Sequence, residues 1–169
     1  YQQQVPMPDE HDLLDAYRRV QRLYASYGIT TVQEGMLPES LLPIYRTLLE
    51  HGLLELDVVA YPSVDALDAV CNAFPEAVRR YHGHFKIGGC KLFLDGSPQG
   101  RTAWMRTPYQ GAAEGYRGYG TMTDEAVREA LLHAYRSGMQ PLAHCNGDAA
   151  AAQYLAAAAA VEREHPDFR

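Results

Sequence analysis

Lysine is scarce in this 169-residue chain, which contains only Lys86 and Lys91. The 15 basic residues are otherwise arginines, and against 21 acidic residues they leave a formal charge of −6 at pH 7. Nucleic acids and anionic membranes attract surfaces of net positive charge, which this composition does not provide. We therefore expect neither nucleic acid nor a membrane surface as a partner.

Long apolar runs and paired cysteines are also absent. The longest apolar stretch, Leu155 to Val161, is far shorter than the roughly 20 residues needed to cross a bilayer. The three cysteines include no CxxC pair, so we expect neither a disulfide framework nor a thiolate zinc site. These absences predict a soluble protein of the reducing cytoplasm.

The pattern of apolar residues predicts an α/β fold. After a leading helix, four short β-rich runs are each followed by a helix, which indicates right-handed crossovers and a parallel sheet in one domain over residues 1–169. The expected helices are 9–27, 38–51, 64–74, 124–137 and 148–165, and the expected strands are 29–33, 54–61, 85–95 and 140–144. The irregular segment 96–122 is longer than an ordinary βα connection, so it is a candidate active-site loop.

Polar residues gather where the expected strands end. They are Gln33, Glu34, Lys91, Asp95, His144 and Asp148. In parallel α/β folds the C-terminal edge of the sheet carries the binding and catalytic residues. The sequence therefore predicts a functional site at this edge.

Lys91 lies in the middle of an apolar strand, where alternation places it on one face with Phe93 and Asp95. Burial disfavours the ammonium form and leaves a nucleophilic amine, which can take up carbon dioxide and become an anionic, metal-binding carbamate. The alternatives are a lysine that extends to solvent or one that forms a salt bridge with Asp95 or Glu34.

His144 ends the last expected strand, and Asp148 stands at the start of the helix that follows. A neutral imidazole at such an edge is a common metal ligand, and a nearby carboxylate can fix its tautomer. The alternative is a hydrogen-bonded core histidine with Asp148 as a helix N-cap. Cys145 points to the opposite face of the strand, which disfavours it as a nucleophile beside His144.

The long loop and the remaining histidines carry weaker signals. Arg101 could meet a substrate carboxylate or carbonyl, although an ordinary surface loop fits it equally well. His82 and His84 resemble a metal pair, but they precede the third strand at the N-terminal edge, so we expect a surface turn. The histidines at 11, 133 and 165 lie on expected helices and suggest no function.

Several of these segments together resemble the YtcJ-like branch of the metal-dependent amidohydrolases. The matching segments, in the same order as in that family, are 28–32, 89–97, 101–103, 108–109 and 144–150. The resemblance implies that residues 1–169 form strands two to five of a (β/α)8 barrel of the TIM type. It also implies one or two divalent metals, usually zinc, that activate water to attack an amide or related C–N bond of a small molecule.

By the same resemblance, Lys91 matches the family's strand-four ligand, which is often carboxylated, and His144 matches its strand-five ligand. Glu34, Asp95, Arg101 and Asp148 are then expected to support the ligands or to bind substrate. The family's other ligands and its catalytic aspartate have no counterpart here. We therefore expect an internal fragment of a longer enzyme, inactive alone, that self-associates or joins the rest of its barrel. The alternative is a stand-alone, non-catalytic α/β module that binds a small ligand.

Overall fold

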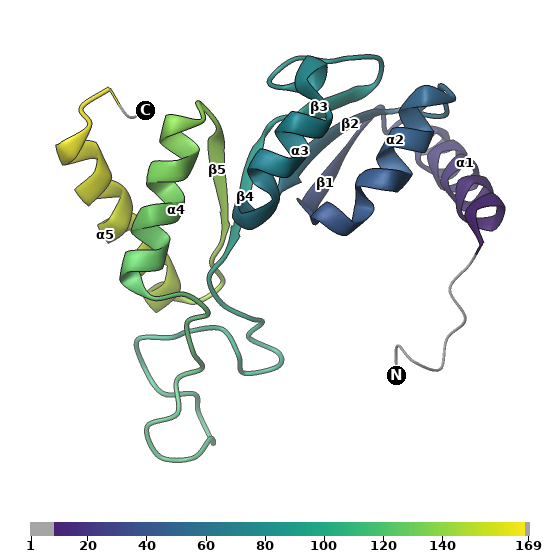
Figure 1. Cartoon of the computed structure of the whole chain (residues 1–169). Coiled ribbons are helices and arrows are strands. Elements are labelled where there is room, and N and C mark those ends of the chain that lie inside the picture. Colours follow the sequence, from purple (N-terminus) through teal and green to yellow (C-terminus); the bar gives the residue numbers. More distant parts are fainter. Residues whose placement is uncertain (1–8, 168–169) are drawn as a thin grey trace.

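A computed structural model describes residues 9–167, which form a three-stranded and a two-stranded parallel sheet in succession, with helices beside them (Figure 1). The strands are β1 (Thr31–Leu37), β2 (Asp57–Pro62), β3 (Phe85–Ile87), β4 (Gly89–Phe93) and β5 (Gln140–His144). The helices are α1 (Glu10–Ser26), α2 (Leu42–Glu50), α3 (Leu67–Ala73), α4 (Asp124–Arg136) and α5 (Asp148–Glu164). Single 3₁₀ turns are η2 (Glu39–Leu41), η3 (Val64–Ala66) and η4 (Pro75–Ala77). The predicted order of elements is confirmed, and the outermost residues of the 1–169 span lie outside the described range.

The third predicted strand, 85–95, is divided in the structure. Its first part, β3, pairs in parallel with β2, whereas its second part, β4, pairs in parallel with β5. A single bridge between Ser63 and Lys91 connects β4 back to the end of β2. The division falls at Gly88 and Gly89, where a Cβ at Gly89 would lie 2.1 Å from the carbonyl oxygen of Gln140. The change of neighbour therefore requires glycine at the point of closest approach.

Burial alternates along β4 and shows that the helices cover only one face of the sheet. Cys90 and Leu92 are at most 2% exposed, whereas Phe93 is 40% exposed. The covered face packs against α2 to α5 around Phe85 and Leu131, which are completely buried. The opposite face of the strands is open.

Several boundaries differ from the sequence prediction; β2, for example, begins at Asp57 rather than at residue 54. β1 begins and ends later than the predicted 29–33, and its pairing with β2 is irregular between Glu34 and Leu37. The third helix begins with the 3₁₀ turn η3 and ends before Pro75, as expected of a residue that breaks a helix. Within residues 9–167, no helix has the length and hydropathy of a membrane span.

Candidate functional site

The carboxyl ends of β4 and β5 bring the two predicted metal ligands to one face of the sheet. Phe93 and His144 are register partners, and their rings stack with centroids 4.5 Å apart. Lys91 pairs with Leu142, two residues earlier on each strand. Because side chains two residues apart share a face, Lys91 and His144 are diagonal neighbours on the open face.

Lys91 is half-buried and forms no ion pair with any residue of 9–167. The two salt bridges considered from the sequence are not formed, because Asp95 and Glu34 each have other partners. Lys91 instead lines a cavity of about 420 Å³ that it shares with Phe93, Asp65 and Glu129. Lys91 therefore borders open space, and His144 is not among the residues that line it.

Asp95 is completely buried, and its carboxylate is occupied by backbone N–H groups. It accepts hydrogen bonds from the amides of Trp104 at 2.9 Å, Asn146 at 2.8 Å and Gly147 at 2.6 Å. One of its oxygens also lies 3.9 Å from Nε2 of His144. Asp95 therefore holds the long loop and the turn after β5 beside His144.

The two ring nitrogens of His144 have different surroundings. Nε2 lies 3.0 Å from Nδ2 of Asn146, and the same amide nitrogen donates to the carbonyl of Gly96 at 2.8 Å. With the amide oriented in this way, Nε2 accepts and the ring proton is on Nδ1. Nδ1 has no hydrogen-bond partner in the described part of the chain. It is therefore the nitrogen open to a ligand.

Glu34 does not join this group. β1 continues to Leu37, so Glu34 lies within the strand and faces the helices with Val32 rather than standing at the edge. Its carboxylate accepts a hydrogen bond from the hydroxyl of Tyr45 at 3.0 Å, and Tyr45 also bonds to Tyr17. Burial, with the charge of Glu34 as a smaller cause, raises the pKa of both tyrosines. The structure thus places the Glu34 carboxylate against Tyr45 of α2, on the face of the sheet that the helices cover.

Arg101 and Asp148 are used by the loop itself. Arg101 donates from Nη1 to the carbonyl of Gly111 at 3.4 Å, and its own carbonyl accepts from the hydroxyl of Tyr116. Asp148 accepts a hydrogen bond from the amide of Arg106 at 2.8 Å. The N-cap of α5 is Gly147, not Asp148 as the alternative prediction had it. Both residues therefore shape the loop rather than His144.

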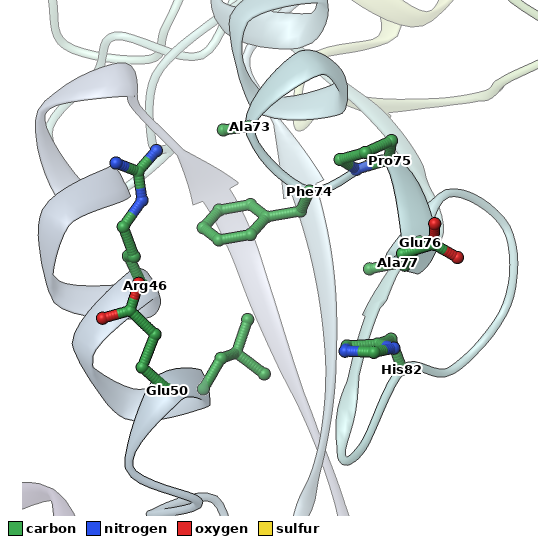
Figure 2. A pocket seen from close by; sticks show the side chains of 9 residues that line it. Arg46, Glu50, Ala73, Phe74, Pro75, Glu76, Ala77 and His82 are labelled. Atoms are coloured by element: carbon green, nitrogen blue, oxygen red, sulfur yellow. The ribbon is translucent and has the colours of Figure 1, made fainter.

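His82 and His84 lie in an exposed turn, as expected, and Nδ1 of His84 is 2.8 Å from a carboxylate oxygen of Asp57. His82 lines a cavity of about 280 Å³ between α2 and η4 (Figure 2). In that view Arg46 comes from α2, and the ring of Phe74 points toward it from the end of α3. None of the candidate site residues lines it, so it is separate from the C-terminal edge.

One group with metal-binding atoms has no counterpart in the sequence prediction. Asp9, His11 and Asp12 are exposed at the start of α1, and their ligand atoms lie within 4.8 Å of one another. Asp9 also caps the helix by accepting from the amide of Asp12. The close spacing of these residues in the sequence was the available signal.

We expect the cysteines to be unreactive in the folded chain. Cys90 is completely buried, and burial raises its pKa to about 11. Burial, and then the charge of Asp95, also raises the pKa of Cys145, while Lys91 opposes the shift. A thiol must ionise to react, so iodoacetamide at pH 8 should leave Cys90 unmodified and label it once urea unfolds the chain. Rapid labelling of Cys90 before unfolding, located by peptide mass mapping, would contradict its position.

Comparison with known proteins identifies the family. The model of the Amidohydrolase family matches residues 1–169. A crystal structure of an uncharacterized metal-dependent hydrolase from Pyrococcus furiosus is 27% identical, with a TM-score of 0.77, over 92% of this chain and 33% of that one. A second, from Pyrococcus horikoshii OT3, is 26% identical, with a TM-score of 0.76, over 91% of this chain and 31% of its own. No curated protein matches. The chain spans about a third of these structures, and it belongs to the amidohydrolase family.

Proposed function

We propose that this chain forms part of the catalytic domain of a metal-dependent hydrolase of the YtcJ-like kind. The substrate is a small molecule with an amide or related C–N bond. The observation that carries the proposal is the pair formed by Lys91, free of ion pairs within residues 9–167, and His144 on one face at the C-terminal edge. Two solved metal-dependent hydrolases share the fold of this chain, which supports the proposal.

The donor atoms fit a divalent metal, for which zinc is our choice. His144 offers Nδ1, and Lys91 offers an amine that becomes an oxygen ligand when it adds carbon dioxide and releases one proton to give a carbamate. A metal at this position supplies a Lewis acid and lowers the pKa of a water molecule. Zinc sites use three or four ligands, so this chain provides part of the set.

The remaining ligands and the proton-transferring base are proposed to come from the rest of a (β/α)8 barrel. The matching structures are about three times as long as this chain, which leaves room for those parts. Surfaces for it to cover are offered by exposed apolar residues of α1 and its C-cap and by the open side chain of Phe93. The residues at α1 are Val20, Leu23, Tyr24 and the C-cap Tyr27. Self-association of the chain would cover the same surfaces.

Zinc titration of residues 1–169, followed by calorimetry and by the NMR signals of the His144 ring, tests the proposal. We expect weak binding that bicarbonate strengthens, because carbamate formation completes the Lys91 ligand. Lys91→Met and His144→Gln should each lower the affinity at least tenfold. The chain alone should not turn over N-acyl amides.

Two variants serve as controls. Lys86→Met removes the other lysine, which lies on β3, and should leave zinc affinity unchanged. His11→Ala disables the exposed cluster at the start of α1 and should also leave it unchanged. Loss of binding in His11→Ala, with none in Lys91→Met or His144→Gln, would assign the metal to that cluster and refute the proposed site.

A further inference from the structure

The turn after β5 places two residues in competition for one ring nitrogen. Nε2 of His144 faces both the side-chain amide of Asn146 at 3.0 Å and a carboxylate oxygen of Asp95 at 3.9 Å. Asn146 offers a donor at this point, whereas the carboxylate offers only an acceptor. The two partners therefore require opposite tautomers of His144.

A metal on Nδ1 decides between these partners. A neutral imidazole that gives its Nδ1 lone pair to a metal must carry its proton on Nε2. The Asn146 amide nitrogen cannot accept that proton, and its orientation is fixed by the carbonyl of Gly96. Asp95 offers an acceptor 3.9 Å away, and a carboxylate is a common partner for the second nitrogen of a metal-bound histidine.

We propose that Asp95 is a positioning residue that receives the Nε2 hydrogen bond of His144 when a metal binds, replacing Asn146. The inference rests on the proposed metal site. Because the same carboxylate holds the amides of Trp104 and Gly147, metal binding and the position of loop 96–122 become linked. Coupling of this kind is reciprocal, so a fixed loop favours the metal and the metal favours a fixed loop.

The contact between the loop and the turn is tight enough to transmit such a change. A Cβ on Gly147 would lie 1.9 Å from the carbonyl oxygen of Trp104, and the amide of Ala149 donates to that same oxygen at 3.1 Å. A shift of Asp95 toward His144 therefore acts on backbone that is already in contact.

The test follows the His144 tautomer by ¹⁵N NMR, without metal and with zinc. In the metal-free chain we expect the proton on Nδ1. Asn146→Ala removes the competing donor but keeps the backbone amide that bonds to Asp95, so the proton should move to Nε2 even without metal. Zinc should give the same Nε2–H state in the unmodified chain and slow hydrogen exchange at the amides of Trp104 and Gly147.

Asp95→Asn should lower zinc affinity about 10- to 100-fold and remove the zinc-dependent protection of the loop. Asp148→Asn is the matched control, because Asp148 also holds a loop amide, that of Arg106, but has no contact with His144 among the described residues. It should loosen the loop at Arg106 and leave the His144 tautomer unchanged, and through the coupling it should lower zinc affinity much less than Asp95→Asn does.

The outcomes separate this inference from the proposed function. If zinc does not bind, the proposed function fails, and the tautomer in metal-free Asn146→Ala still tests the contact. An unchanged His144 ring in Asn146→Ala would overturn the inference, as would equal losses of zinc affinity in Asp95→Asn and Asp148→Asn. If Asp95→Asn does not fold, the zinc-dependent exchange of the unmodified chain decides, and no added protection at Trp104 and Gly147 refutes the coupling.

Discussion

Replacing Phe85 by alanine is expected to lower the free energy of unfolding by about 3–5 kcal/mol, the usual cost of removing a fully buried phenylalanine. Phe85 is completely buried, and its ring lies 5.1 Å from that of Tyr45 and 5.3 Å from that of Phe74. The variant would leave a cavity between β3 and the helices that these rings cannot fill. Urea unfolding followed by circular dichroism measures the change.

Phe93→Ala is the matched control on the same predicted strand. Phe93 is 40% exposed on the open face and contacts the ring of His144. Its loss should cost below about 1.5 kcal/mol, roughly the value of one aromatic pair. Equal losses for the two variants would show that both faces are covered in solution and would support self-association over the open face.

Gly147→Ala is expected to destabilise the chain by about 2–3 kcal/mol, as overpacking in a tight contact does. The backbone of Gly147 is of the extended kind that any residue adopts, so strain in φ and ψ is not the cause. The added Cβ would meet backbone atoms of Trp104, all closer than 3 Å, and would push the loop from α5. Urea unfolding and limited proteolysis of residues 96–122 measure the two effects.

Gly35→Ala provides the comparison, because a Cβ at Gly35 meets nothing within 4 Å and its φ is not positive. Alanine there should be neutral or slightly stabilising, since glycine weakens a strand interior. If Gly147→Ala were as neutral as Gly35→Ala, the loop would not lie against the start of α5.

Alternation and strand order were enough to predict the parallel sheet and the face shared by Lys91 and His144. Both depend on local spacing, because side chains two residues apart on a strand point the same way. The register of β4 with β5 then sets the two residues diagonally across the pair. Short-range patterns of this kind are what a sequence displays directly.

The surroundings of Glu34 and Asp95 could not be predicted in the same way. Whether Glu34 stands at the edge of the sheet depends on where β1 ends, and the strand continues to Leu37 beyond the β-rich run. The burial of Asp95 depends on a loop that returns nine residues later through Trp104 and on a turn that arrives from β5. Such contacts are set by tertiary packing, which propensity and alternation do not contain.

The change of neighbours at Gly88 and Gly89 also bears on how the chain acquires its fold during synthesis. Every strand pair up to Ile87 joins segments that are consecutive along the chain, so β1, β2 and β3 are complete before β4 is made. Pairings that are short in sequence form quickly, and chains fold from the N-terminus as they leave the ribosome. Residues 31–87 can therefore form a hydrogen-bonded, helix-covered unit first, and β4 and β5 join it afterwards, so that among the described residues the Lys91 and His144 positions are ordered after the first three strands.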